Sequence, residues 1–266
     1  MHNDAPFPLA DFASEQIVLE RSDFAVRLAD SDGRRNSSSV LINRMYSWRG
    51  YKNSIEHAAR SADQITLQAC RRDKVFGTLT LSFDSEAGLA ADGLYRSEID
   101  AYRSRGARVC ELTRLAIDPD HSSKEVLGAL FHLAYIQGAL LRDTTDVFIE
   151  VNPRHVSFYR RMLHFRKAGE CRMCERVGAP AVLLHLEVAH VAEQIALHGG
   201  GREPRPNSLY PYFFSAEEAA ALPRRLASAR LGPRVLTIEP VSQLPVNATT
   251  PLPERRLRAR GALLPK

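Results

Sequence analysis

The sequence predicts an α/β fold in which a mixed central sheet carries helices on both faces. Strand-like and helix-like spacings of apolar residues alternate along the chain up to about residue 200. Such alternation is typical of a sheet whose connections are helices packed on its two faces. The composition then changes at residues 199–201, Gly-Gly-Gly, beyond which ten of the 15 prolines lie. A C-terminal appendage is therefore expected after the main domain.

The expected strands are short runs rich in β-branched and other apolar residues. Two of them, 64–72 and 75–84, flank Asp73-Lys74 and predict a β-hairpin. The remaining strands are expected over residues 24–29, 108–118, 146–151, 165–170 and 181–188.

Helical spacing predicts four helices in the main domain, over residues 38–48, 94–106, 122–141 and 153–163. The helix over 122–141 has the clearest apolar face, and Ser122 with Glu125 predicts a capping box at its start. In the last helix Asn152 is the expected N-cap, and Pro153 occupies the first position. The apolar face of the first helix is expected to contain Val40, Leu41, Met45 and Trp48.

These elements divide the chain into three parts. Residues 1–22 are expected to be an N-terminal extension, 23–200 the folded domain, and 201–266 a Pro/Arg-rich segment. One helix is predicted over 215–230, and from about residue 232 the composition predicts an extended or disordered tail.

The net charge of +5 is unevenly distributed. Residues 202–266 hold 11 Lys and Arg against 5 Asp and Glu, which leaves 25 against 26 for residues 1–201. The main domain therefore lacks the basic footprint of a nucleic-acid-binding protein. We expect no nucleic-acid partner.

The sequence predicts a cytoplasmic protein without a membrane span. No run approaches the roughly 20 apolar residues that a spanning helix needs, and the N-terminus lacks the apolar core of a secretory signal. Four cysteines are too few for a disulfide framework. Cys171 and Cys174 have the spacing of half a zinc site, but no second pair is near in sequence, so no metal is expected.

Four segments in fixed order carry a resemblance to a known family. They are MYSWRGY, CELTRLAIDP, EVLGALFHLAYI and IEVNPRHVSFYRRML. Together they resemble the N-acyl amino acid synthases, a long-chain acyl branch of the GCN5-related N-acetyltransferase superfamily. The resemblance covers about residues 35–195. It implies the acyltransferase fold of that superfamily and transfer of an acyl group from a thioester to an amine.

The last segment is similar to the superfamily's closing strand–helix–strand unit. Asn152, Tyr159 and Phe165 match its asparagine, its helix tyrosine and the Phe of its Gly-Phe pair, and His164 stands where glycine is usual. The second segment resembles the Glu-x-Ser/Thr-Arg strand of acyl-homoserine-lactone synthases. Its matching residues are Glu111, Thr113 and Arg114.

The chemistry of amide formation assigns roles to two of these residues. An α-amino group has a pKa near 8 and must lose a proton before it attacks. Glu111 is the expected general base. Tyr159 is the expected acid that protonates the departing thiolate. A backbone N–H of the strand over residues 111–117 is expected to hold the thioester carbonyl. A structural ion pair of Glu111 with Arg114, and a packing role for Tyr159, are the alternative interpretations.

Arg114 is predicted to bind the carboxylate of an amino-acid acceptor through its planar guanidinium, with Thr113 and Arg49 as further acceptor-binding candidates. In a regular strand, however, Glu111 and Arg114 point to opposite faces because their spacing is odd. A β-bulge would bring both onto one face. We therefore predict a bulge near residues 113–115.

The loop after this strand has no glycine between Pro119 and Val126. Gly-rich loops surround a pyrophosphate such as that of coenzyme A, whereas a capped helix start suits a single phosphate. We therefore expect the phosphopantetheine arm of an acyl carrier protein as donor and no tightly bound cofactor. The expected donor-binding residues are Leu115, Ala116, Ile117, Ser122, Ser123, Lys124, Glu125, Val126 and Asn152.

A basic cluster follows the predicted donor site. It consists of Arg154, Arg160, Arg161 and Lys167 and is interpreted as a docking patch for the acidic carrier protein or, alternatively, as a solvated helix face. Three alternative functions remain open. They are an acyl-CoA-dependent N-acyltransferase, a catalytically degenerate binding module, and a synthase using S-adenosylmethionine, whose N-terminal charged positions have no match in residues 24–60.

Overall fold

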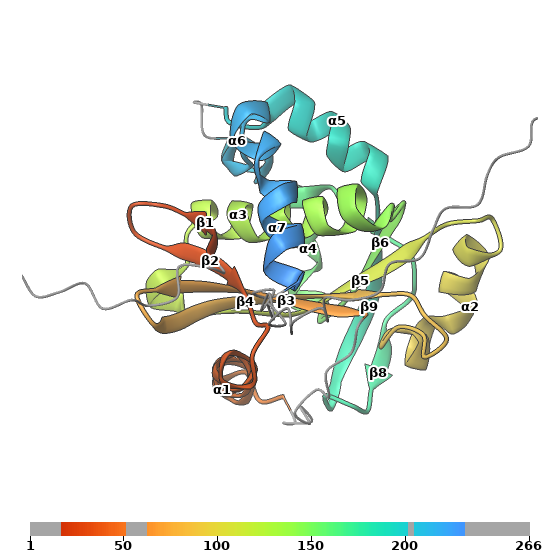
Figure 1. Ribbon diagram of the computed structural model, residues 1–266. Helices are drawn as coiled ribbons and strands as arrows, with labels where there is room; N and C mark the ends of the chain where they lie inside the picture. The colour runs from red at the N-terminus through yellow and green to blue at the C-terminus, as the bar shows by residue number, and fades with distance from the viewer. Residues whose placement is uncertain (1–16, 52–62, 202–204, 232–266) are drawn as a thin grey trace, which may run out of the picture. The chain divides into compact units, whose positions relative to one another are not determined.

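The computed structural model describes residues 17–51, 63–201 and 205–231, and these residues contain a nine-stranded mixed sheet (Figure 1). The strand order is β1-β2-β3-β4-β5-β6-β9-β7, and β8 pairs with β9. The strands are β1 (Ile17–Glu20), β2 (Ala25–Leu28), β3 (Gln64–Arg71), β4 (Lys74–Phe83), β5 (Val109–Ile117), β6 (Asp146–Val151), β7 (Arg166–Lys167), β8 (Arg172–Cys174) and β9 (Ala179–Glu187).

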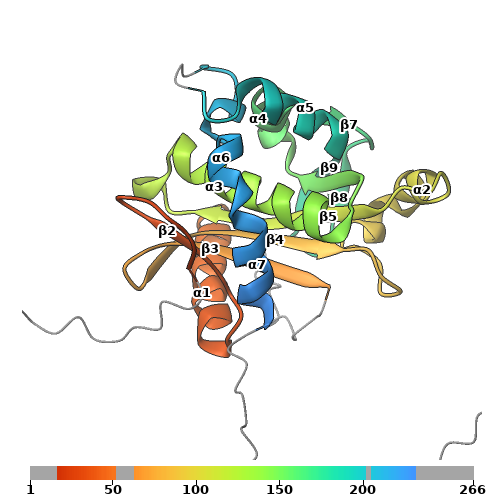
Figure 2. The ribbon, with the colours of Figure 1, turned by 45° about the horizontal axis from the view of Figure 1, so that its top comes forward.

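Helices cover both faces of this sheet, which confirms the predicted fold class (Figures 1 and 2). The helix α1 lies on one face, and α3 with the C-terminal helices lies on the other. The helices are α1 (Asp32–Trp48), α2 (Asp92–Arg103), α3 (Lys124–Tyr135), α4 (Pro153–Leu163), α5 (Val188–His198), α6 (Ala216–Ala220) and α7 (Leu222–Leu231). Shorter turns are 3-10 turns at Pro119–His121 and Tyr210–Tyr212 and a π turn at Ile136–Leu140.

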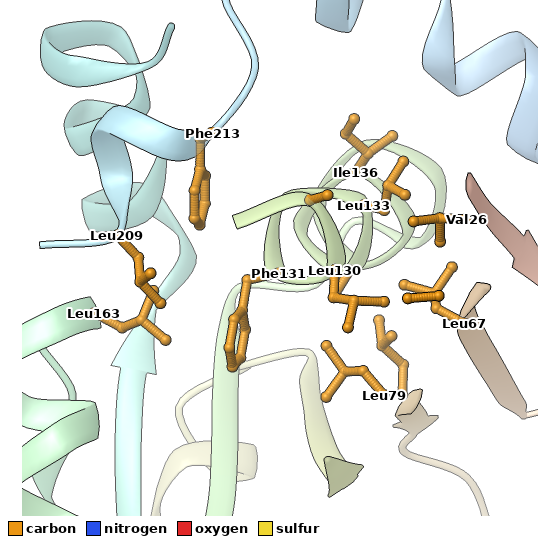
Figure 3. Packing of buried hydrophobic residues seen from close by; sticks show 14 of the residues in the cluster. Val26, Leu67, Leu79, Leu130, Phe131, Leu133, Ile136, Leu163, Leu209 and Phe213 are labelled. Carbon is orange, nitrogen blue, oxygen red and sulfur yellow. The ribbon is translucent and has the colours of Figure 1, made fainter. Parts of the chain in front are cut away.

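The helix α3 is the centre of the larger core and buries two of its sides (Figure 3). One side packs toward the sheet, where Leu130 faces Leu67 and Leu79. The other side carries Phe131 toward Leu163 of α4 and Phe213 of the C-terminal segment. This second side borders the candidate active site.

The strands β5 and β6 run parallel and separate after three residue pairs, of which Glu111–Phe148 is the last. Beyond this pair β5 continues beside β4, without a β6 neighbour among the described residues. We call this separation the β5–β6 fork. It leaves the β6-side edge of residues 112–117 unpaired by strand hydrogen bonds.

The predicted bulge in β5 is confirmed. Thr113 pairs with Thr80 and Ala116 with Thr78, so two residues of β5 stand opposite Leu79 alone. Arg114 is the first of these two residues and has a left-handed φ of 53°. The hydroxyl of Thr78 donates to the carbonyl of Arg114 at 2.9 Å and holds the bulge in place.

His164 occupies the position where the family resemblance expects glycine. It follows the last residue of α4 and adopts a left-handed φ of 65°. Glycine is favoured at helix ends of this kind because the conformation penalises a side chain. His164 therefore adopts a conformation that suits glycine although it carries a side chain.

The folded unit does not end at residue 200, where the sequence predicted the end of the domain. Apolar side chains of the segment 205–231 are buried in the same core as α3 and the sheet. The strand β1 likewise lies inside the predicted N-terminal extension but pairs with β2. These ends contact each other through an ion pair of 2.9 Å between Arg21 and Glu218. The described residues thus form one compact unit, and the predicted tail from residue 232 lies outside them.

Several predicted helix details need correction. The helix α1 begins at Asp32, and Val40 and Trp48 are 69% and 70% exposed although they were expected in its apolar face. The face toward the sheet instead combines Leu41, Ile42 and Met45 with the polar Ser38, whose hydroxyl binds the amide of Gln68 at 2.7 Å. Because the buried face of α1 contains a polar residue, the spacing of its apolar residues alone pointed to the wrong face of the helix.

The start of α3 also differs from the prediction. The N-cap is Ser123, whose hydroxyl accepts from the N–H of Val126 at 3.2 Å, whereas Ser122 closes the preceding 3-10 turn. The predicted capping box of Ser122 and Glu125 is therefore wrong by one residue. The predicted strand 165–170 shrinks to β7, and α5 and β8 were not predicted.

Candidate active site

Glu111 is a fully buried carboxylate at the β5–β6 fork. Its Oε2 accepts from the N–H of Ala91 at 3.3 Å, and its Oε1 has no hydrogen-bond partner among the described residues. Burial and the nearby charge of Glu150 raise the pKa of Glu111 to about 7. At neutral pH this carboxylate is thus poised to take a proton from an ammonium group.

Glu150 was missed by the sequence reasoning and lies on the same face of the sheet. It follows Phe148 by two residues, and Phe148 is the partner of Glu111 across the fork. Its side chain is 8% exposed; Oε1 accepts from Arg176 at 3.1 Å, and Oε2 is buried without a partner among the described residues. A carboxylate inside the apolar run DVFIEV was the available signal.

Arg114 shares this face because of the bulge, and its charge interacts with Glu111 and Tyr46. The guanidinium is partly buried, which lowers its pKa from the ordinary value. Among the described residues, neither an ion pair nor a hydrogen bond holds the guanidinium, so the alternative of a structural pair with Glu111 is not observed. A guanidinium group that lacks a protein partner is suited to binding the carboxylate of a ligand.

Tyr159 connects the two faces of the fork. Its ring packs edge-on against Phe131 and Phe165, with centroids 6.5 and 5.9 Å away. Its hydroxyl interacts electrostatically with Tyr46 of α1 and with Arg49, which follows that helix, and burial raises the pKa of the phenol. The hydroxyl makes no hydrogen bond within the described part of the chain and keeps its proton at neutral pH.

The other predicted acceptor-binding residues lie nearby. Thr113 is half-buried and pairs with Thr80 just before the bulge. Arg49 is also half-buried, and its Nη1 donates to the carbonyl of Met45 at 3.2 Å. Arg49 thus lies at the C-terminal end of α1, and its charge interacts with the hydroxyl of Tyr159.

Among the predicted donor-binding residues, Leu115 and Ile117 pack toward the α3 core, and Ala116 is buried beneath α1. Asn152 caps α4 by accepting from the N–H of Arg154 at 3.2 Å and donates to the carbonyl of Pro180 at 3.2 Å. The polar atoms of Asn152 therefore serve the fold.

Lys124 has a different environment from the one predicted for a phosphate ligand. Its ammonium donates to the carbonyls of Arg205 and Pro206 at 3.3 and 3.1 Å and lies 5.5 Å from the ring centre of Tyr212. Ser122 and Glu125 remain exposed beside it. Lys124 thus ties the C-terminal segment to the start of α3.

An apolar cavity of about 50 Å³ lies on the α3 face of the fork. From β5 it is lined by Cys110, within the β5–β6 pairing, and by Leu112, the first residue after the last pair. Its lining comprises Leu81, Cys110, Leu112, Phe131, Ala134, Tyr135, Gly138, Ala139, Thr144, Val147, Leu163, Phe165, Leu186, Val188, Val191, Tyr210 and Phe213. Hydrocarbon is the ligand chemistry that such walls favour.

The basic cluster is only partly free of protein contacts. Arg154 donates to the hydroxyl of Tyr51 at 2.8 Å, and Lys167 forms an ion pair with Glu170. Arg160 and Arg161 are exposed on α4. Arg161 donates only to the carbonyl of Ser157 within its own helix, at 3.3 Å, so both arginines present charge to solvent.

Within the described residues, no group of three or more His, Cys, Asp or Glu side chains could hold a metal ion. In the same part of the chain, none of the helices is both long and apolar enough to cross a membrane.

Comparisons with known proteins agree with this geometry. The family of the N-acyl amino acid synthase FeeM matches residues 37–187. The solved structure of FeeM from uncultured soil microbes has a TM-score of 0.58 and 23% identity, over 62% of this chain and 92% of that one.

Two further solved structures are more distant. An acyl-CoA N-acyltransferase from Pseudomonas aeruginosa has 14% identity and a TM-score of 0.44, over 61% of this chain and 97% of that one. Spermidine/spermine N-acetyltransferase SpeG from Vibrio cholerae has 11% identity and a TM-score of 0.45, over 65% of this chain and 99% of that one. No curated protein matches the chain. By the family match, which spans more than half of its length, the chain belongs to the N-acyl amino acid synthase FeeM family and is an N-acyltransferase.

Proposed function

We propose that this enzyme transfers a long-chain acyl group from an acyl carrier protein thioester to the α-amine of an amino acid. One observation carries the proposal: the β5–β6 fork has an apolar cavity on one face and a buried cluster of carboxylates and arginines on the other. A hydrocarbon chain and a zwitterionic acceptor need these two opposite environments. The thioester carbon then lies at the fork, between them.

On the donor side, the acyl chain enters the cavity past Leu112, and the thioester follows the unpaired edge of β5. Backbone N–H groups of residues 115–117 on that edge hydrogen-bond the carbonyl oxygen as it gains negative charge. Fixed donors of this kind stabilise the tetrahedral intermediate more than the thioester itself.

On the acceptor side, the guanidinium of Arg114 binds the acceptor carboxylate. The ammonium group is held by the two unpartnered oxygens, Oε1 of Glu111 and Oε2 of Glu150. Glu111 takes one proton from the ammonium, and the free amine attacks the thioester carbon. The C–N bond forms and the C–S bond breaks, which releases the thiol of the carrier arm, the N-acyl amino acid and one proton.

Tyr159 stabilises the departing thiolate. Its raised pKa keeps the phenol protonated, so it donates a hydrogen bond while the sulfur gains charge. Its ring contacts with Phe131 and Phe165 fix its position between the two faces of the fork.

The preference for a carrier protein over coenzyme A is supported by two features. The loop between Pro119 and Val126 has no glycine with which to surround a pyrophosphate. Arg160 and Arg161 expose positive charge on α4, the helix that also carries Tyr159. An acyl-CoA donor is the alternative.

The test uses the purified full-length enzyme with a mixture of the twenty amino acids. Acyl carrier protein thioesters and CoA thioesters of the same chain are supplied separately at equal concentration, and products are identified by mass spectrometry. We expect an N-acyl amino acid that forms faster from the carrier protein and disappears with Glu111→Gln. Equal or faster turnover of the CoA thioester would contradict the donor assignment, and no product from either donor would contradict the proposed reaction.

A further inference from the structure

We propose that Tyr210 and Phe213 in the C-terminal segment form the wall that sets the length of the acyl chain. This inference rests on the proposed function. Both residues line the apolar cavity, yet both lie beyond residue 187, where the match to the FeeM family ends. The chain therefore supplies part of the acyl pocket from outside its family region.

The wall is anchored to α4. Tyr210 is fully buried, and its hydroxyl donates to the carbonyl of Leu163 at 2.8 Å. The N–H of Leu209 donates to the carbonyl of Met162 at 3.0 Å. Phe213 packs 5.2 Å from the Tyr210 ring and faces Phe131 and Leu163 across the space beside α3 (Figure 3).

The same segment is anchored to α3. The N–H of Phe214 donates to Nδ1 of His132 at 2.8 Å, and the His132 ring stacks on Phe213 and Phe214 at 5.1 and 4.7 Å. Lys124 holds the segment at the start of the helix. With attachments to two helices, the segment forms a defined wall rather than a loose covering.

The π turn after α3 forms another part of the cavity lining. Gly138 lies there, and a Cβ added to it would meet Thr144 and Leu81 at 3.7 to 3.9 Å, which is ordinary contact. The cavity volume is small, about 50 Å³, so its walls leave little free space between them. In a pocket this narrow, one side chain of the lining decides how many methylene groups fit.

These contacts provide a matched set of variants. Phe213→Ala removes a ring from the wall, and Gly138→Ala adds a methyl group to the lining at the π turn. Phe214→Ala is the control, because Phe214 is as buried as Phe213 and also stacks on His132 but does not line the cavity. Each full-length variant is given a series of acyl carrier protein thioesters from short to long, and kcat/KM is measured for each length.

We expect Phe213→Ala to move the optimum to chains longer by about two to four methylene groups, since interiors are close-packed and the lost ring frees that much space. Gly138→Ala should move the optimum to shorter chains, and Phe214→Ala should leave it unchanged. Identical length profiles for the wild type, Phe213→Ala and Gly138→Ala would overturn the inference. A shift with Phe214→Ala equal to that with Phe213→Ala would also overturn it.

A binding measurement separates this inference from the proposed function. Saturated fatty acids of increasing length are added to the same proteins, and the rise in Tm is recorded for each length. If no thioester is turned over, the proposed function fails while a longer binding optimum for Phe213→Ala still supports the wall. If turnover occurs and neither assay shows a length shift, only the wall is contradicted. Should Phe213→Ala fail to fold, Phe213→Leu and Gly138→Ala give the same comparison.

Discussion

Glu111 and Glu150 lie on the same face of the sheet, one on each side of the β5–β6 fork, and each has one buried oxygen without a partner among the described residues. Burial disfavours the charged form of Glu111, and the neighbouring carboxylate adds to the effect. The resulting pKa of about 7 makes Glu111 a stronger base than an ordinary carboxylate.

Glu111→Gln should lower kcat/KM by at least about 100-fold, because it removes the base and keeps the shape of the side chain. It should also change the pH dependence of folding. A pKa raised from 4.5 to about 7 stabilises the native state fully below pH 4.5 and loses that contribution as pH rises through 7. The loss amounts to roughly 3 kcal/mol. Urea unfolding at pH 5 and pH 8 should show this loss in the wild type only; equal losses in both proteins would contradict it.

Glu150→Gln should shift the acid limb of the kcat/KM profile to lower pH. The negative charge of Glu150 raises the pKa of Glu111, so its removal allows Glu111 to lose its proton earlier, by about half to one pH unit. The matched control is Glu175→Gln, an exposed carboxylate in the turn that also carries Arg176. If the acid limb of the kcat/KM profile were unchanged in Glu150→Gln, the charge of Glu150 would have no effect on the pKa of Glu111.

Arg114→Gly and Arg114→Ala separate the guanidinium from the strained backbone. Both variants should raise KM for the amino acid by about 10-fold or more, because both lose the carboxylate ligand. The glycine variant should have the larger free energy of unfolding, by about 1 kcal/mol, because only glycine adopts a φ of 53° without strain. Steady-state kinetics and urea unfolding measure the two effects. An unchanged KM would remove Arg114 from the acceptor site.

Charge reversal at Arg160 and Arg161 should weaken the use of the carrier protein specifically. We expect KM for the acyl carrier protein thioester to rise about 10-fold at low salt, with less effect as salt increases, because the contact is electrostatic. KM for a CoA thioester should stay the same. The control reverses Arg224 and Arg225, which are exposed on α7. Equal effects of the two reversals would indicate a nonspecific change in net charge.

His132 should make the C-terminal segment sensitive to acid. Burial lowers the pKa of His132 from 6.5 to about 4, against a small opposing effect of Glu218, and its neutral ring accepts the N–H of Phe214. The unfolded chain takes up this proton below pH 6.5 while the folded chain resists it down to about 4. Stability is therefore lost between these values, by roughly 3 kcal/mol. In His132→Gln, which keeps an acceptor without titrating, urea unfolding should show less loss over this range.

The regular parts of the fold were predictable because their signals are local. The strand β6 and the helix α4 have the predicted bounds, since Asp146 begins an apolar run and Asn152-Pro153 marks a helix start. The bulge at Arg114 followed from a chemical requirement that two residues of opposite parity share one face. Both arguments need only a short stretch of sequence.

The missing parts depend on contacts between distant segments. Glu150 resembles an ordinary strand residue until the β5–β6 fork places it beside Glu111. The segment 205–214 has no regular spacing that could predict its burial, and Lys124 contacts it from 81 residues away. The helix α5 was missed because it follows β9 without an intervening glycine or proline.

The meeting of β1 with α7 bears on how this enzyme can be divided. The FeeM match starts after β1 and β2 and stops before α5, so it omits both ends. Those ends pack against each other over α3, and the ion pair of Arg21 with Glu218 links them. If residues 37–187 were expressed alone, the outer side of α3 would be exposed to solvent. Shortening either end to attach a fusion partner would remove the contacts that hold the other end in place. The catalytic family and the folding unit therefore have different borders in this chain.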